Sequence, residues 1–424
     1  MTRLYPAKRW TIALFLTVAL SLIMTSAECT SNLTKGVSAE NIIAYQGSPA
    51  VVKIFTTFDG TLKSSLYQKN TVQLWGNMHS TFLQQEQPDY SGAFTLDIPQ
   101  FSYGGQGTGF VISSDGYIVT NAHVVDMSDE ELKSKFVQQA VKWAINNWPE
   151  MLKDRGFEVF PQTTDEVNYI IEFFNAYQLQ RSSSPQIYVY FGDPSGNADM
   201  GEGHPAEISK SDPAEMKYSA DKFYRYRSGK DIAVIKCEGV HDLITATLGD
   251  SNSVDVGDKV IVVGYPGVAE SGFHDYLSRK TDLVPTVTSG IISARKKLPD
   301  DSDVFQTDTS ITHGNSGGPA FSENGEVIGI ATFVSYTYLE GDVYTEVQGF
   351  NFLIPINVAM RFIKELNVDT TPSQSTQHLF SGLNYYWTKD YSQALREFNA
   401  VRNVNTVDRY SLNYAAKCQA AGQL

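Results

Sequence analysis

Short runs of β-forming residues alternate with turn residues from Ala50 to about Ile356. The runs cover 51–55, 109–112, 117–120, 187–191, 232–235, 260–263 and 327–333. Many short strands in a chain of 424 residues, 42% of them hydrophobic, favour a β-sandwich or β-barrel over a doubly wound sheet. Glycine supplies the positive φ of tight hairpins, so Gly116 and Gly325 predict two such turns. The predicted fold class is mainly β.

One segment, residues 128–178, departs from this pattern. Ser128 to Glu131 reads as a helix capping box, and residues at every fourth position then form one apolar face: Leu132, Phe136, Ala140 and Ala144. A second helix start follows at Thr163, and the break is predicted near Pro149 and at 156–161. We therefore expect an inserted helical pair, which is either a satellite packing layer or a cover beside a functional cleft.

The chain after Leu366 changes character again. A linker-like stretch at 370–377 precedes a segment, 378–424, predicted to be a helical hairpin. Its small and aromatic residues stand at the spacing of a tetratricopeptide repeat: Gly382, Tyr385, Tyr391, Ala394 and Phe398. A single repeat cannot bury its own apolar face. The hairpin is therefore expected to pack against the rest of the chain or against a protein partner.

The N-terminus predicts export. Residues 1–27 run from basic to apolar to small, which is typical of a signal peptide, with an uncleaved membrane anchor as the alternative. Residues 28–48 form an N-terminal segment. The expected location is periplasmic, extracellular or membrane-anchored. Three distant cysteines make no disulfide framework. A net charge of −14 without a basic run argues against nucleic acid as a partner.

The loop from Gly314 to Pro319 carries the strongest chemical signal. Glycines on both sides of Ser316 let the backbone turn tightly, expose the hydroxyl and point successive N–H groups into one small space. The same letters fit the nucleophile elbow of α/β-hydrolases, in which the acid and then the histidine follow the serine. Only His378 follows Ser316, and it lies in the helical segment. The elbow is therefore disfavoured.

Two upstream residues complete a different order. His123 follows an apolar strand pattern, and Asp231 stands at the start of another. The order His, Asp, Ser is that of the chymotrypsin-like fold.

Around these residues the chain resembles the HtrA (Deg) branch of trypsin-like proteases. The resemblance spans about residues 49–360 and rests on the segments 107–112, 117–125, 231–236, 256–267, 289–293, 306–321 and 349–355. It implies a protease domain at 49–366 with two antiparallel six-stranded β-barrels. It also implies a triad of His123, Asp231 and Ser316, with Gly314 and Ser316 as the oxyanion-hole donors. We do not expect a counterpart of that family's PDZ domain in the residues after 366.

The resemblance also locates a specificity pocket, with Ser310 at its base and Ala331 and Phe333 in its wall. These residues carry no charge, so we expect a shallow, apolar pocket. Asp308 is expected to be a structural carboxylate. His79, His204, His241 and His274 lack metal-ligand spacing. No metal or other cofactor is expected.

The expected function is hydrolysis of peptide bonds in exported or misfolded proteins through an acyl-enzyme intermediate. Polypeptides are thus the expected substrates. The alternative is a catalytically silent protease fold that acts as a scaffold or chaperone and binds peptides and partners. The oligomeric state is not predicted.

Overall fold

The computed structural model describes most of the chain. It covers residues 37–63, 98–153, 164–196, 201, 203–213, 215–218, 225–267, 278–298, 300–339 and 343–422. The predicted leader at 1–27, Cys29, His79 and His274 lie outside these residues. Within them, no helix has the length and apolar character needed to cross a membrane.

The first β-barrel is built from strands of the N-terminal half. Around the barrel the order is β1-β2-β3-β9-β6-β5, and pairing of β1 with β2 closes the ring. The strands are β1 (Val51–Lys63), β2 (Phe101–Val111), β3 (Tyr117–Thr120), β5 (Gln186–Phe191), β6 (His204–Asp212) and β9 (Ile232–Cys237). A short strand, β4 (Gln178–Arg181), extends β1 on the outside, and β7 (Glu215–Tyr218) pairs with β8 (Arg225–Ser228) as a separate ribbon.

The second β-barrel follows in the chain. Its order is β15-β14-β11-β12-β13-β16, closed by pairing of β15 with β16. The strands are β11 (Lys259–Gly264), β12 (Thr286–Lys297), β13 (Asp303–Thr307), β14 (Pro319–Phe321), β15 (Glu326–Leu339) and β16 (Val343–Pro355), with β10 (Thr247–Leu248) added beside β15. All pairs within the two rings are antiparallel. The prediction of two six-stranded antiparallel barrels is confirmed.

The predicted hairpin turns are present. Gly116 has φ +103° between β2 and β3, and Gly325 has φ +80° between β14 and β15. These are left-handed conformations that side chains disfavour, which explains why glycine occupies both positions.

Two helices, α5 (Asp129–Lys153) and α6 (Thr164–Asn175), form the insert. The amide of Glu131 donates to Ser128 Oγ at 3.2 Å, as the capping pattern predicted. The predicted break near Pro149 is wrong, because α5 continues to Lys153. Proline removes one backbone donor, but its fixed φ is compatible with helix.

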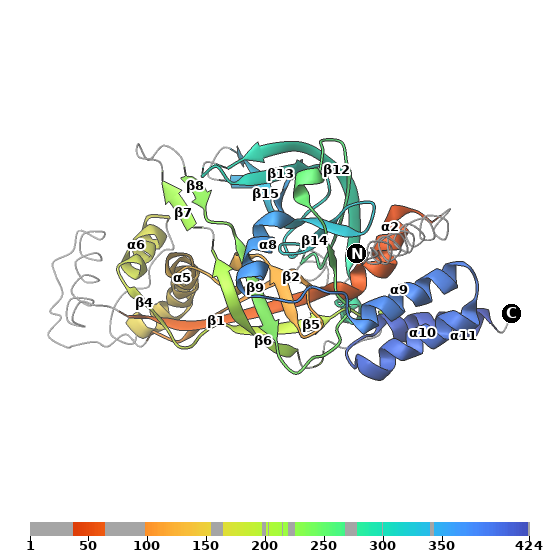
Figure 1. The fold of residues 1–424 in the computed structure, drawn as a ribbon. Helices are drawn as coiled ribbons and strands as arrows, with labels where there is room; N and C mark the ends of the chain where they lie inside the picture. The colour runs from red at the N-terminus through yellow and green to blue at the C-terminus, as the bar shows by residue number, and fades with distance from the viewer. Residues whose placement is uncertain are drawn as a thin grey trace, which may run out of the picture.

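The insert has a hydrophobic cluster of its own. Phe136 and Phe174 of the helices pack with Phe58, Leu62 and Phe101 of the extended β1–β2 ribbon. In Figure 1 the two helices lie at one end of β1, away from the C-terminal helices. This arrangement favours the interpretation of the insert as a satellite packing layer.

The C-terminal segment is helical, as predicted, and contains α9 (Gln374–Trp387), α10 (Tyr391–Val404) and a third helix beyond the predicted hairpin, α11 (Tyr410–Ala421). Helix α9 begins inside the stretch predicted as a linker, because the Ser373 hydroxyl accepts from the amide of Thr376 at 2.9 Å and caps the helix. The remaining elements are α2 (Ala39–Gln46), α4 (Ala122–Val125), α8 (Ile356–Glu365) and the 3₁₀ turns η1 (Ser48–Ala50), η2 (Ser251–Ser253) and η3 (Arg279–Thr281).

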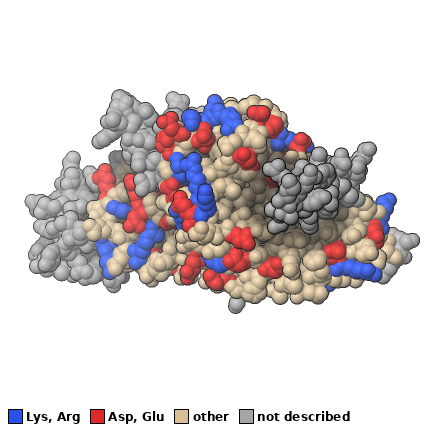
Figure 2. Space-filling view, in the orientation of Figure 1, with Lys and Arg blue, Asp and Glu red and all other residues tan. Residues whose placement is uncertain are grey.

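The C-terminal helices share a core with the barrels. One cluster contains Phe110 of the first barrel, Phe321 of the second, Ile43 of α2 and Phe398 of α10. Figure 1 shows α9, α10 and α11 beside α2. The predicted packing of this segment against the rest of the chain is therefore observed, whereas its similarity to a tetratricopeptide repeat stays a prediction. Figure 2 shows the same face of the molecule, with acidic and basic side chains interspersed over it.

Candidate active site

The three predicted triad residues come from three different elements. His123 lies in α4, the single turn after β3, and Asp231 directly precedes β9. Ser316 lies in the loop that enters β14 of the second barrel. Asp231 has φ +52°, a left-handed conformation that is uncommon for a residue other than glycine and that clusters at functional sites.

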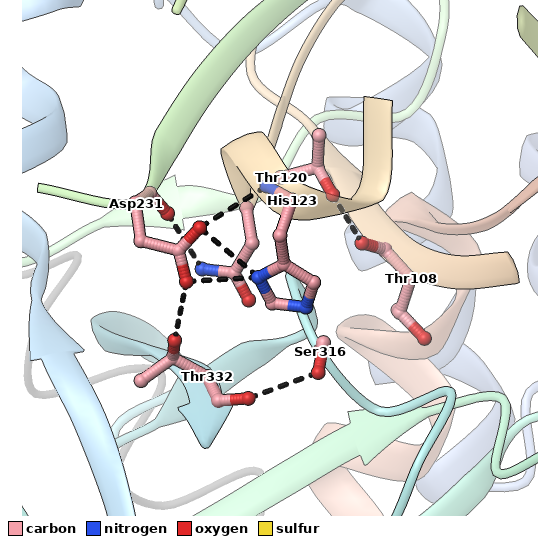
Figure 3. Close-up of polar contacts among 7 residues, drawn as sticks. Thr108, Thr120, His123, Asp231, Ser316 and Thr332 are labelled. Atoms are coloured by element: carbon pink, nitrogen blue, oxygen red, sulfur yellow. Dashed lines mark hydrogen bonds and ion pairs between the residues drawn. The ribbon is translucent and has the colours of Figure 1, made fainter. Parts of the chain in front are cut away.

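His123 and Asp231 are hydrogen bonded. The Nδ1 atom of His123 lies 2.8 Å from Oδ2 and 3.0 Å from Oδ1 of Asp231. The backbone N–H of His123 donates to the same carboxylate at 3.1 Å. Because a carboxylate accepts from Nδ1–H, the neutral ring has its lone pair on Nε2. Figure 3 shows this second nitrogen on the side of the ring that faces Ser316.

Thr332 joins the acid to the serine. Its hydroxyl donates to Asp231 Oδ2 at 2.9 Å, and its carbonyl accepts from Ser316 Oγ at 2.9 Å. In this structure the Ser316 hydroxyl therefore points to Thr332 and not to His123 (Figure 3). Such looser geometry is common without a substrate, and rotation about one side-chain bond redirects the hydroxyl.

The carbonyls of residues 313–316 each accept a hydrogen bond. Those of His313 and Asn315 accept from the amides of Gly267 at 2.6 Å and Gly318 at 2.9 Å. Those of Gly314 and Ser316 accept from the Thr108 hydroxyl at 2.7 Å and the Thr108 amide at 2.9 Å.

The loop amides divide into two groups. Those of Asn315, Gly317 and Gly318 donate to the carbonyls of Thr312, Ala331 and Asn315 at 3.0, 2.8 and 2.9 Å. Among the described residues, the amides of Gly314 and Ser316 have no acceptor. This pair is the one predicted for an oxyanion hole. Gly314 has φ +95°, and a Cβ there would lie 2.3 Å from the Tyr265 carbonyl oxygen, so only glycine fits.

Of the predicted specificity residues, Ser310 lies in the loop after β13, and Ala331 and Phe333 lie within β15. Ser310 is exposed, and its carbonyl accepts from Thr288 Oγ1 at 3.0 Å, while Ala331 is fully buried. The Phe333 side chain lies outside the described residues. The Asp308 carboxylate accepts from the amide of Ile291 at 2.7 Å, which agrees with the expected structural role.

The sequence alone predicts no role in the site for two residues that contact the triad or its loop, Thr332 and Thr108. Thr332 contacts Asp231, which is 101 positions away, and Thr108 contacts Gly314, which is 206 positions away. A local sequence pattern cannot predict contacts over such separations. His204 and His241 do not approach the site through any described contact. Among the described residues, no three His, Cys, Asp or Glu side chains are arranged to hold a metal ion.

The fold is trypsin-like, since it consists of two antiparallel six-stranded barrels. The histidine and the aspartate lie on the first barrel, and the serine loop lies on the second. Comparison with known sequences agrees with this fold. The family described as "Trypsin-like peptidase domain" matches residues 192–330, which include Asp231 and Ser316.

The chain is similar in sequence to proteins described as DegP-like serine endoproteases. It is 30% identical over 344 residues to "Probable periplasmic serine endoprotease DegP-like" of Pseudomonas savastanoi pv. phaseolicola, covering 77% of this chain and 50% of that protein. It is 32% identical over 179 residues to "Magnetosome formation protease MamE" of Paramagnetospirillum magneticum, covering 41% of this chain and 22% of that one.

A solved structure, "HtrA-type protease AlgW with decapeptide", is also similar, with 21% identity, a TM-score of 0.40, and coverage of 78% of this chain and 68% of that one. The chain spans half or less of the length of several curated relatives that it matches.

Proposed function

We propose that this chain is a serine endopeptidase that cleaves peptide bonds through an acyl-enzyme intermediate. His123 takes the proton of the Ser316 hydroxyl as its oxygen attacks the scissile carbonyl, and later gives that proton to the leaving amine. Asp231, which accepts from Nδ1–H, holds the ring in the reactive tautomer and stabilises the imidazolium. Water then releases the acyl group from Ser316, with His123 as the base.

The oxyanion formed in each step binds to the amides of Gly314 and Ser316. Every other amide from Asn315 to Gly318 already has an acceptor in the fold, so these two donors are available without any rearrangement. A preorganised donor of this kind contributes about 3 to 4 kcal/mol to transition-state stabilisation. The pair of free amides beside a hydrogen-bonded His123–Asp231 couple is the observation that carries the proposal.

We propose polypeptides as the substrates and an exported, periplasmic location as the site of action. The support is the basic, apolar and small order of residues 1–27 together with relatives described as periplasmic serine endoproteases. Exported or misfolded proteins are the substrate class that this location offers. We also propose that residues 1–27 are either a cleaved signal peptide or a membrane anchor. Residues 378–424 are the segment proposed to bind a protein partner.

A silent scaffold is the alternative function. A scaffold has no need of a histidine held in one tautomer or of two unpaired amides beside a serine hydroxyl. These features favour catalysis over scaffolding.

The test combines turnover with labelling. The purified chain should hydrolyse unfolded casein and react covalently with a fluorophosphonate probe at Ser316. Ser316→Ala should lose both reactions, while Ser310→Ala, altered in the same segment, should keep the labelling. His123→Ala and Asp231→Asn should each lower turnover by orders of magnitude without unfolding the protein, because triad residues act as one unit. A wild-type chain that binds casein without cutting it, and resists the probe, would establish the scaffold instead.

A further inference from the structure

Thr108 of β2 connects the first barrel to the second through its hydroxyl and its amide, while its carbonyl accepts from the Thr120 hydroxyl within the first barrel. Its hydroxyl donates to the Gly314 carbonyl at 2.7 Å and accepts from the Tyr265 amide at 2.9 Å. Its amide donates to the Ser316 carbonyl at 2.9 Å. Thr108 is completely buried. A residue of one barrel therefore holds the carbonyls on both sides of Asn315 in the other.

The peptide plane between Gly314 and Asn315 is fixed at both of its ends. The carbonyl end is bound by the Thr108 hydroxyl, and the N–H end donates to the Thr312 carbonyl at 3.0 Å. This plane lies between the two unpaired amides, those of Gly314 and Ser316. Its rotation would change the directions of both, because they belong to the adjoining peptide units. Gly314, which lacks a Cβ, offers little steric resistance to such a rotation.

The carbonyls of this loop are otherwise held by backbone amides. Thr108 contributes the one described side-chain bond to the carbonyls of residues 313–316. A substitution that removes its hydroxyl releases the Gly314 carbonyl together with the Tyr265 amide and leaves the backbone bonds of the loop in place. Two glycines let the Thr108 side chain pack closely against the second barrel: a Cβ on Gly264 would meet Thr108 Oγ1 at 3.1 Å, and a Cβ on Gly318 would meet Thr108 Cγ2 at 3.2 Å.

We propose that Thr108 is a positioning residue, whose hydroxyl keeps the oxyanion amides of Gly314 and Ser316 in their reactive directions. The proposal rests on the proposed peptidase function and goes further, since it assigns control of the oxyanion loop to the opposite barrel. Oxyanion donors act only within about 2.7 to 3.1 Å of the developing charge, so even a small rotation reduces their effect.

The test uses Thr108→Val, which keeps the shape and removes the hydroxyl, and Thr108→Ala, which avoids overpacking if the valine variant does not fold. Removing one oxyanion donor costs about 100-fold to 1000-fold in kcat. In Thr108→Val the amides of Gly314 and Ser316 should be misdirected but still present. We therefore expect kcat for a small apolar peptide substrate to fall by about 10-fold to 100-fold, with KM nearly unchanged. Thr108→Ser, which restores the hydroxyl, should recover most of kcat.

Thr376→Val is the matched control. Thr376 is also buried, and its hydroxyl accepts from the Thr245 amide at 2.9 Å, the same length as the Tyr265 bond, but it belongs to α9. It should lose a similar amount of thermal stability and keep wild-type kcat. Equal kcat in wild type and Thr108→Val, or equal losses in Thr108→Val and Thr376→Val, would overturn the proposal.

A readout that needs no turnover separates this proposal from the function on which it rests. Hydrogen exchange at the Asn315 amide should accelerate in Thr108→Val and not in Thr376→Val, because that N–H belongs to the released peptide plane. If wild type lacks all peptidase and probe reactivity, the proposed function fails, and this exchange rate still decides whether Thr108 holds the loop. Unchanged exchange contradicts the role of Thr108.

Discussion

The hydroxyl of Thr332 donates to Oδ2 of Asp231 at 2.9 Å, so a residue of the second barrel holds the acid of the first. Asp231 also accepts two hydrogen bonds from His123, one from the backbone and one from the ring, and its own carbonyl accepts from Asn121 Nδ2 at 2.9 Å. With 5% of its surface exposed, the carboxylate is fixed from several directions. Its left-handed backbone is maintained by these bonds.

Thr332→Val should lower kcat about 10-fold to 100-fold. A hydrogen bond to a charged group contributes about 1.5 to 3 kcal/mol, and its loss loosens the carboxylate that orients His123. Thr332→Ser keeps the hydroxyl and should stay near wild type. Peptide turnover by the two variants is the measurement. If valine and serine variants are equally active, the hydroxyl has no part in holding Asp231.

Cleavage should follow Val, Ala, Leu or Ile more often than Lys or Arg. Ser310 offers only a hydroxyl, Ala331 offers a methyl, and the Asp308 carboxylate accepts from the Ile291 amide. A basic side chain would lack a partner, and an unpaired buried charge costs several kcal/mol. Mass-spectrometric mapping of casein fragments checks this. Ser310→Asp should raise the share of cuts after Lys and Arg. Cuts by wild type mainly after basic residues would point to Asp308 instead.

Phe398→Ala should destabilise the whole protein by about 3 to 5 kcal/mol. Phe398 is fully buried in the cluster that includes Phe110 and Phe321 of the barrels. Its loss should therefore shift one common unfolding transition, followed by circular dichroism and by loss of probe labelling. Leu412→Ala, on exposed α11 surface, should change stability by no more than about 0.5 kcal/mol. Two separate transitions, with labelling unaffected, would mean that the helices fold as an independent unit.

Asp408 predicts a specific pH dependence of stability. Burial raises the pKa of its carboxyl above 3.8, although the carboxylate accepts from the amides of Tyr410 and Ser411 at 3.0 Å. A carboxyl whose pKa is higher in the folded protein than in the unfolded chain stabilises the fold. This stabilisation is complete at pH values below the pKa in the unfolded chain, and it is lost as the pH rises through the pKa in the folded protein. Asp408→Asn cannot lose a proton. Its free energy of unfolding should therefore rise relative to wild type as the pH increases above about 4, where wild-type Asp408 begins to lose its proton in the unfolded chain.

Urea unfolding at several pH values gives this difference. Asp369→Asn is the control, because the pKa of Asp369 is shifted in the opposite direction to that of Asp408. Hydrogen bonds from the Thr371 side chain and backbone lower the pKa of Asp369, so its stabilising contribution is lost as pH falls and not as it rises. A difference between Asp408→Asn and wild type that does not vary with pH would contradict the prediction.

Local sequence patterns predicted most strands but not their lengths. Strand β1 was expected at 51–55 and reaches Lys63, through Asp59 and Gly60. Such residues normally end a strand. Here a Cβ on Gly60 would lie 2.8 Å from the ring of Phe136, so the glycine makes room for α5 on the ribbon. The extension of β1 pairs with β2 and β4 and packs against the insert, and these tertiary contacts are not visible in the local sequence.

The site, like the fold, has some features that local sequence predicts and others that depend on tertiary contacts. His123, Asp231 and Ser316 stand in recognisable local motifs, and the unpaired amides follow from the glycines around Ser316. Thr108 and Thr332 act through contacts with residues 206 and 101 positions away. Nothing in their immediate neighbours reports such partners. The residues that position the chemistry therefore emerge only once the two barrels are placed together.

The contact between the first and last described helices has a consequence for biosynthesis. The Tyr45 ring stacks on the Tyr414 ring with centroids 5.2 Å apart, and the Tyr414 hydroxyl donates to the Tyr45 carbonyl at 3.3 Å, across 369 positions of the chain. Contacts of such long range form late, since a long loop must close first. A nascent chain that lacks α11 leaves Tyr45 and the apolar surface around it uncovered. The mature fold is therefore completed only after synthesis has passed Cys418, and a chain stalled before that point should be held by chaperones as a non-native substrate.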